Sequence, residues 1–196
     1  YKVFISSNIV LTQLRDYLEY SLRLENINAQ VEFGNYDNII QDSYEKKKSN
    51  AILIFWELFN LFEGLHYEIE NYEPSKIRKL IKDVKSEADI LFDNFKDIPL
   101  VIINKFTSLV FTYKNIKKTN LEMLSIVLNE YLIQKAPSNF KIVDLDKIIS
   151  EIGIEQAYDL RYFYSSKAPY TTHFFRSYTD KVKSIFLFIN SHKVGL

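Results

Sequence analysis

Two serines and an asparagine, Ser6, Ser7 and Asn8, end an apolar segment near the start of the chain. The three apolar residues before them are typical of a short buried strand, and apolar residues spaced three and four apart after them predict a helix over about 10–24. In an open α/β sheet, ligands bind just outside the carboxyl ends of the strands. A hydroxyl at that edge, beside the free N–H groups of a helix start, could act as a nucleophile. Ser7 is therefore the candidate nucleophile.

Other polar residues stand where the predicted strands end or where the chain returns to the same edge. Those that could bind a substrate there, or orient a catalytic base, are Ser6, Asn8, Gly34, Glu57, Asn104 and Asp159. Because parallel strands bring their carboxyl ends to one edge of a sheet, these residues can meet in space. A serine, a base and N–H donors for an oxyanion would make a hydrolase-like site. Taken singly, such residues also have ordinary structural roles, since Ser and Asn cap helices and Gly forms turns.

The sequence contains three histidines that could serve as the base. His173 stands at the start of the last predicted helix and is the candidate base, or a polar contact, near Asp159. His66 lies in the long segment after the third predicted strand and ranks below His173. His192 lies near the C-terminus and is not expected to take part.

Several chemistries are not expected from this sequence. It has no cysteine, which excludes disulfides and thiolate metal sites, and its four glycines form no phosphate-binding loop. No metal-ligand spacing is present, so we expect no metal, ATP, NAD or other cofactor in this domain. Asp144 and Asp146 superficially resemble the aspartate pair of haloacid dehalogenase (HAD) phosphatases, but the downstream motifs are missing. We expect Asp146 to cap a helix instead.

Length and charge limit the classes of protein further. The 196 residues, of which 47% are hydrophobic, suit one domain over 1–196. The 25 basic and 25 acidic residues balance, so no overall field attracts nucleic acid or an anionic membrane, and neither is an expected partner. The sequence shows no signal peptide and no apolar run long enough to cross a bilayer. We expect a cytoplasmic protein.

The elements that must position the polar residues alternate along the chain. The predicted strands cover 3–5, 28–33, 51–56, 99–103 and 140–143. The predicted helices cover about 10–24, 37–48, 74–95, 120–134, 145–152 and 171–190. The segments 58–72 and 159–170 have no clear periodicity and are expected to be irregular. This alternation predicts an α/β fold, a three-layer α/β/α sandwich with a mostly parallel five-stranded sheet.

Three segments of the sequence resemble FkbH-like proteins. The segment ISSNIVLTQLRDYLEYSLRLENINAQVEFGNYDNIIQDS (5–43) resembles their amino-terminal region, AILIFWEL (51–58) their third strand, and YDLRYFYSSKAPYT (158–171) the closing motif of the same region. The resemblance spans essentially the whole chain. It implies an SGNH-hydrolase-like (flavodoxin-like) domain, which in that family precedes a HAD-type phosphatase-like domain. The chain would then be the N-terminal part of a longer protein, with that C-terminal HAD-like domain as a partner.

The resemblance also implies a reaction and a second partner. FkbH-like proteins are associated with moving a three-carbon glyceryl unit from a phosphorylated donor onto an acyl-carrier protein or a related acceptor. The implied partner is therefore an acyl-carrier protein or another phosphopantetheine-linked acceptor. This sequence departs from the SGNH pattern in three places. Ser6-Ser7-Asn8 stands where Gly-Asp-Ser is usual, and Tyr162 stands three residues after Asp159, where the pattern has His. The third strand is followed by Trp56-Glu57-Leu58 instead of a glycine and an asparagine, although Asn60 is near.

Three functions agree with these features. In the first, Ser7 attacks an acyl carbonyl, His173 is the base, Asp159 orients it, and N–H groups with the amide of Asn8 or Asn104 stabilise the oxyanion.

In the second, the domain is catalytically degenerate and docks a carrier protein or partner domain. Arg161, also a candidate for substrate binding, would then form a basic face with Lys167 and Arg176. In the third function, the domain is structural, and its aromatic residues near the C-terminal segment bury against another chain.

Overall fold

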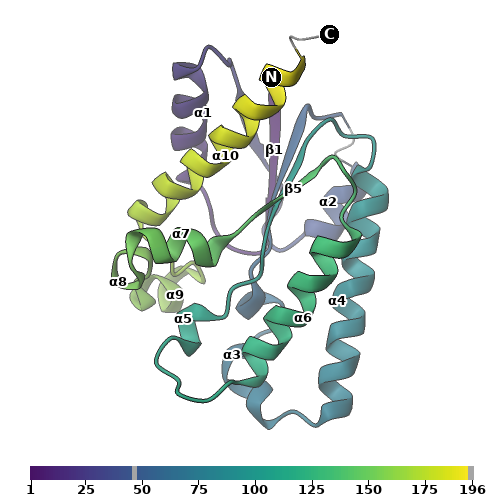
Figure 1. Ribbon diagram of the computed structural model, residues 1–196, viewed down its shortest axis with the longest axis vertical. Coiled ribbons are helices and arrows are strands. Elements are labelled where there is room, and N and C mark those ends of the chain that lie inside the picture. The colour runs from purple at the N-terminus through teal and green to yellow at the C-terminus, as the bar shows by residue number, and fades with distance from the viewer. Residues whose placement is uncertain (46–47, 194–196) are drawn as a thin grey trace.

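Within the residues that the structure describes, 1–45 and 48–193, five strands form one all-parallel sheet. This computed structural model orders the strands β2-β1-β3-β4-β5 (Figure 1). The strands are β1 (Lys2–Ser7), β2 (Gln30–Phe33), β3 (Ala51–Phe55), β4 (Val101–Asn104) and β5 (Phe140–Val143). All five residues of β3 are buried, as expected for a central parallel strand with both faces covered.

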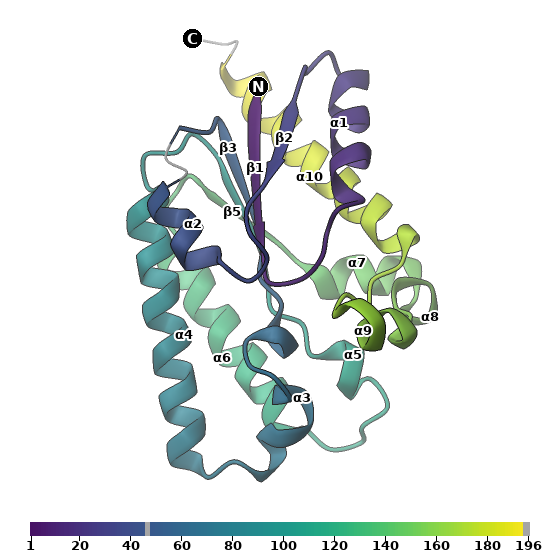
Figure 2. The same ribbon diagram turned by 180° about the vertical axis from the view of Figure 1, so that it is seen from behind.

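Helices cover both faces of this sheet (Figures 1 and 2). One face carries α1 (Leu14–Leu24), α7 (Leu145–Ile152) and α10 (Thr172–Lys193). The other carries α2 (Ile39–Glu45), α4 (Pro74–Phe95) and α6 (Asn120–Lys135). The predicted three-layer α/β/α sandwich is confirmed, and the sheet is parallel throughout.

Local sequence signals explain the long helices on the second face. Pro74 occupies the first turn of α4, where its fixed φ suits a helix and its missing N–H costs nothing. Thr119 and Glu122 form a capping box at the start of α6, each side chain accepting the backbone N–H of the other. Both helices begin where the sequence predicts.

Short helices gather at the carboxyl edge of the sheet, at the opposite end of the molecule from the N-terminus (Figure 1). They are η1 (Leu58–Asn60), α3 (Leu65–Glu68), η2 (Ile69–Asn71), α5 (Leu109–Thr112), α8 (Ile154–Ala157) and α9 (Leu160–Ser166). The expectation of irregular segments is wrong over most of α9 within 159–170, and over η1, α3 and η2 within 58–72. Asp159 caps this helix by accepting the N–H of Arg161, and a backbone bridge between Tyr158 and Tyr170 closes the segment.

Two further expectations differ from the structure. The first helix begins at Leu14 instead of about residue 10, because Ile9 and Leu11 are buried in the core of the first face and hold the chain in a loop. The N-terminus of this helix therefore does not directly follow Ser7. Directly after β5, Asp144 is the N-cap of α7 and accepts the N–H of Lys147. The capping role expected of Asp146 therefore belongs to Asp144.

None of the helices in the described part of the chain combines the length and the apolar character that crossing a bilayer requires.

Gly34 provides a test of the packing behind the edge. A Cβ built on Gly34 would lie 1.9 Å from Oδ2 of Asp42 and 2.9 Å from Cζ of Phe4. We expect Gly34→Ala to lower the free energy of unfolding by about 1–3 kcal/mol, the usual cost of overpacking. The exposed neighbour Asn35 is the control, because Asn35→Ala should change stability by less than about 0.5 kcal/mol. Urea unfolding measures both, and equal stabilities for the two variants would contradict the packing described.

Candidate functional site

Asn8 joins the carboxyl ends of β1 and β3. Its Nδ2 donates to the carbonyl oxygen of Glu57 at 2.8 Å, and its Oδ1 accepts from the N–H of Glu57 at 2.6 Å. This reciprocal pair imitates the hydrogen bonds between neighbouring strands, and the side chain is buried. Both ends of the Asn8 amide are therefore used within the protein.

Asn104 makes the same kind of contact from the other neighbour of β3. Its Oδ1 accepts from the N–H of Trp56 at 2.7 Å, and its Nδ2 donates to the carbonyl oxygen of Trp56 at 2.9 Å. The side chain is fully buried. The structure thus brings Asn8 and Asn104 together with the Trp56–Glu57 segment, as the strand ends predict, but their amides support the backbone.

The two serines at the end of β1 are also occupied. The Oγ of Ser7 donates to the carbonyl oxygen of Ile9 at 2.9 Å and accepts from its N–H at 3.0 Å, and Ser7 is only 8% exposed. Ser6 donates to Oδ2 of Asp42 at 2.5 Å in a buried contact behind the sheet edge. Gly34 lies against the same Asp42 carboxylate, so Ser6 and Gly34 both adjoin this buried side chain.

The predicted triad is not hydrogen-bonded in the structure. Asp159 accepts from Nε and Nη2 of Arg161, the latter at 2.6 Å, and this ion pair holds the pKa of Asp159 below its usual range. His173 is exposed near the start of α10, and its imidazole forms no hydrogen bond with any residue in 1–45 or 48–193. Ser7 is bonded to Ile9. Catalysis by Ser7, His173 and Asp159 stays a prediction, as does substrate binding by Arg161.

Glu57 is the most unusual titratable group at this edge. It is completely buried, and burial raises its pKa to about 8 in spite of hydrogen bonds to its carboxyl group. The hydroxyl of Tyr170 donates to Oε2, and the N–H of Leu58 donates to Oε1 at 3.2 Å. Burial, with the nearby charge of Glu57, raises the pKa of Tyr170 well above its usual range. Glu57 is thus a buried group linked to Tyr170, and it is not exposed to a ligand.

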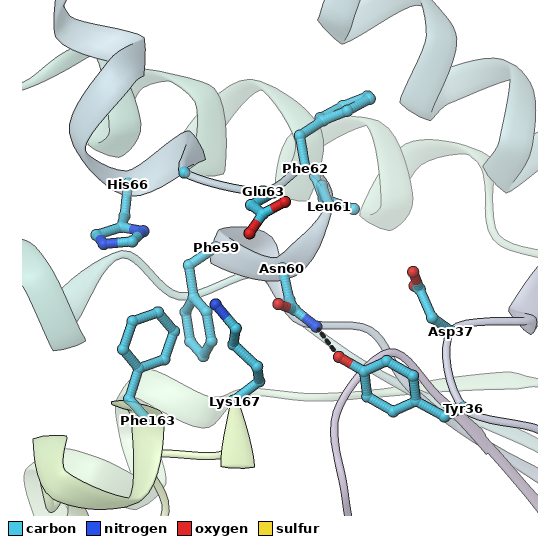
Figure 3. A pocket seen from close by; sticks show the side chains of 11 residues that line it. Tyr36, Asp37, Phe59, Asn60, Leu61, Phe62, Glu63, His66, Phe163 and Lys167 are labelled. Atoms are coloured by element: carbon cyan, nitrogen blue, oxygen red, sulfur yellow. Dashed lines mark hydrogen bonds between the residues drawn. The ribbon is translucent and has the colours of Figure 1, made fainter. Parts of the chain in front are cut away.

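A cavity of about 200 Å³ opens beside these buried residues (Figure 3). It lies between the segment after β2, the short helices after β3 and helix α9. The lining residues are Tyr36, Asp37, Phe59, Asn60, Leu61, Phe62, Glu63, Gly64, His66, Phe163 and Lys167. The Nδ2 of Asn60 donates to the Tyr36 hydroxyl at 3.0 Å and to the carbonyl oxygen of Asn8. Asn60 therefore connects the cavity to the end of β1.

His66 forms part of the cavity wall and has unused hydrogen-bonding capacity. Its ring stacks on Phe111 with centroids 4.2 Å apart, and its buried Nδ1 has no hydrogen-bond partner among the described residues. Burial and the nearby Lys167 lower the pKa of His66, so the imidazole is predominantly neutral at pH 7. The ammonium of Lys167 lies 5.4 Å from the centre of the Phe163 ring.

Of the two histidines considered, His66 lines the cavity and His173 is exposed on α10. The position of His66 after the third strand is a sequence signal for the carboxyl edge. No comparable signal indicates the contact between Tyr170 and Glu57, because 113 residues separate the partners.

No group of three or more His, Cys, Asp or Glu in the described ranges is arranged to hold a metal ion.

Comparison with known proteins gives two structural likenesses. No protein-family model matches the sequence, and no curated protein matches it. The N-terminal part of protein BF1531 from Bacteroides fragilis, described as containing a phosphatase domain complexed with Mg, matches 94% of this chain with a TM-score of 0.72 and 16% identity. The salicylyl-acyltransferase SsfX3 from a tetracycline biosynthetic pathway matches 95% with a TM-score of 0.51 and 11% identity.

These proteins share the fold. At 16% and 11% identity the likeness extends to nothing further. This chain covers 50% of the first structure and 54% of the second, so it spans about half of each.

The buried carboxyl of Glu57 predicts a pH dependence of stability. Its pKa is about 8 in the folded protein and 4.5 ordinarily, so between these values the folded state binds the extra proton. The free energy of unfolding should therefore fall as pH rises from about 5 to 8, by at most about 1.4 kcal/mol per pH unit from this group. Glu57→Gln removes the titration and should remove this slope.

Urea unfolding at several pH values measures the free energy of unfolding of wild type and of Glu57→Gln. The contributions of the other titrating groups cancel in the difference between the two proteins. The exposed Glu63 supplies the control, since Glu63→Gln should keep the wild-type slope. A Glu57→Gln profile parallel to that of wild type would show that Glu57 is ionised in the folded protein at neutral pH.

Proposed function

We propose that this chain is an SGNH-hydrolase-like domain of the FkbH-like type that takes part in acyl or glyceryl transfer to an acyl-carrier protein or similar acceptor. Its part in the transfer is to bind the end of the carrier's phosphopantetheine arm in the cavity at the carboxyl edge. Ser7 does not act as the nucleophile. A C-terminal HAD-like domain of the same chain would act on the phosphorylated donor.

The observation that carries this proposal is the set of hydrogen bonds that the Ser7 hydroxyl forms. A serine nucleophile needs an adjacent base that takes its proton. The Oγ of Ser7 is instead engaged twice with Ile9, and it is not hydrogen-bonded to a histidine. The contacts that would make Ser7 reactive are therefore lacking, while the fold that would support a binding site is intact.

The cavity supports binding of a small polar group. At about 200 Å³ it is below the roughly 300–1,000 Å³ usual for sites that enclose a drug-sized ligand. It suits the end of an arm better than a whole cofactor. Asn60, neutral His66 and Lys167 provide hydrogen-bonding groups around it, and the rings of Phe59 and Phe163 give it an apolar wall (Figure 3). Such a mixture fits a short acyl group with polar substituents.

The two structural likenesses support the proposal only in outline. One neighbour is described as containing a phosphatase domain, and this chain covers 50% of it, which agrees with a HAD-like partner domain. The other is an acyltransferase, which agrees with acyl chemistry on this scaffold.

A second candidate function keeps Ser7 as the nucleophile of an acyl transfer. It is favoured by the place of Ser7 at the carboxyl end of β1, next to Asn8, whose carbonyl oxygen accepts from the Asn60 amide. The carboxamide of Asn60 could turn toward an oxyanion once a substrate enters. The second function requires the Ser7 hydroxyl to leave Ile9 and a histidine to approach it.

Binding and turnover separate the two functions. We expect wild type and Ser7→Ala to bind acetyl-pantetheine with dissociation constants within twofold of each other. Asn60→Ala should weaken binding at least fivefold, about 1 kcal/mol, because Asn60 lines the cavity. The matched control is Asn115→Ala, at an exposed asparagine outside the cavity. Titration calorimetry measures binding, and p-nitrophenyl acetate hydrolysis measures esterase activity.

Esterase turnover that is present in wild type and lost in Ser7→Ala would reject the binding role in favour of the Ser7 nucleophile. If Asn60→Ala binds acetyl-pantetheine as well as wild type does, the arm does not enter this cavity.

A further inference from the structure

A basic loop lies between α5 and α6, over residues 113–118 (the lysine loop). Lys114, Lys117 and Lys118 are all exposed, and none of them forms an ion pair with any residue in the described part of the chain. The sequence contains no Asp or Glu between Asp97 and Glu122. The carboxylates of Glu70 and Glu122 adjoin the end of the loop and accept backbone N–H groups of 119–121. The loop itself carries three positive charges and no negative one, on a chain whose total charge is balanced.

An apolar side chain stands in the middle of these lysines. Ile116 is fully exposed, at 103% of its reference area, and Tyr113 at the start of the loop is 44% exposed. Single exposed apolar residues are common on protein surfaces. Lys114 lies over the Tyr113 ring, 5.3 Å from its centre. A fully exposed isoleucine between three lysines that form no ion pair in the described residues differs from single exposed residues, because it combines an apolar anchor with a charged rim. Protein interfaces have this anatomy.

The lysine loop is also joined to the candidate site. It directly follows α5, and Phe111 of α5 stacks on His66 in the cavity wall. Figure 1 shows the loop at the same end of the molecule as α3 and α9, whose residues line the cavity. A partner held by the loop would lie beside the cavity.

The three cations expected to form a basic face, Arg161, Lys167 and Arg176, do not share one open surface. The guanidinium of Arg161 is paired with Asp159. Arg176 lies over the ring of Tyr17, 5.6 Å from its centre, on the α1–α10 side of the molecule. Of the three expected cations, Lys167 points into the cavity itself (Figure 3).

We propose that the lysine loop docks an acidic face of the carrier protein whose arm enters the cavity, with Ile116 inserting into an apolar hollow of that face. This inference rests on the proposed function and names the surface that its partner uses. Three cations around an apolar side chain suit a protein face. A nucleic acid would call for a longer basic track without an apolar centre.

Charge reversal tests the docking surface. The probe is a purified acidic bacterial acyl-carrier protein, in its holo form and in its apo form without the arm. We expect Lys114→Glu/Lys117→Glu/Lys118→Glu to weaken holo-carrier binding at least tenfold at low salt and to abolish its salt dependence. The control variant, Lys48→Glu/Lys82→Glu/Lys96→Glu, makes the same change of net charge at exposed lysines outside the loop and should bind within twofold of wild type.

The apolar contact has its own variant. Ile116→Ser should weaken binding about threefold to tenfold while the salt dependence stays that of wild type. Because these side chains are exposed, the melting temperatures of all variants should match that of wild type, which separates docking from unfolding.

The outcomes distinguish the docking surface from the proposed function. If Asn60→Ala weakens binding of the holo carrier but the lysine-loop variant binds it as wild type does, the docking surface is overturned. The proposed function then still stands. Apo-carrier binding that depends on the loop supports the docking surface even if acetyl-pantetheine fails to bind in the cavity. If the loop binds a single-stranded oligonucleotide and no carrier protein, the docking proposal is overturned in favour of a nucleic-acid partner.

Discussion

Two asparagine side chains hold the backbone where β3 ends. Asn8 follows one neighbouring strand and Asn104 ends the other. Asn8 bonds both the N–H and the carbonyl oxygen of Glu57, and Asn104 bonds the same two groups of Trp56. A strand that ends inside a protein leaves backbone groups that must find partners. The asparagine amides supply those partners after the ladder stops, and so the chain can turn away from the sheet without orphaned N–H or C=O groups.

The same constraint occupies the polar side chains at the strand ends of this protein. The amides of Asn8 and Asn104 and the hydroxyl of Ser7 all satisfy backbone groups. Groups with capacity to spare lie farther out, in the short helices that follow the strands. His66 belongs to this outer set, since its Nδ1 has no partner in the residues described. The sheet edge supplies the support, and the connecting segments supply the groups that face the cavity.

The sequence predicted the layers well because their signals are local or periodic. The bounds of β5 and α7 agree with the structure, and α4 begins at Pro74 as predicted. The carboxyl edge was also identified in advance, because parallel strands must end together. The start of α1 was missed, since the burial of Ile9 is a tertiary effect that outweighs helix propensity. Helix α9 was missed because its apolar residues are too few to show a period.

The choice between His66 and His173 could not be made from local sequence. Whether a ring faces a cavity depends on what it packs against, and the partner of His66 is Phe111, forty-five residues away in a different connection. His173 lies near the start of a long helix, where its exposed face points to water. Sequence position indicated the edge for both histidines, and only tertiary contacts separate them.

Glu57 contacts the two connections that form opposite sides of the cavity. Burying a carboxyl group is costly unless its oxygens have partners, and the cost falls mainly on the ionised form. Glu57 meets this requirement with Leu58 in the chain that follows β3 and with Tyr170 in the segment that follows α9. The same side chain thus contacts the connection that carries Phe59 and His66 and the one that carries Phe163 and Lys167. Glu57 does not line the cavity, but it links the two connections that form its walls.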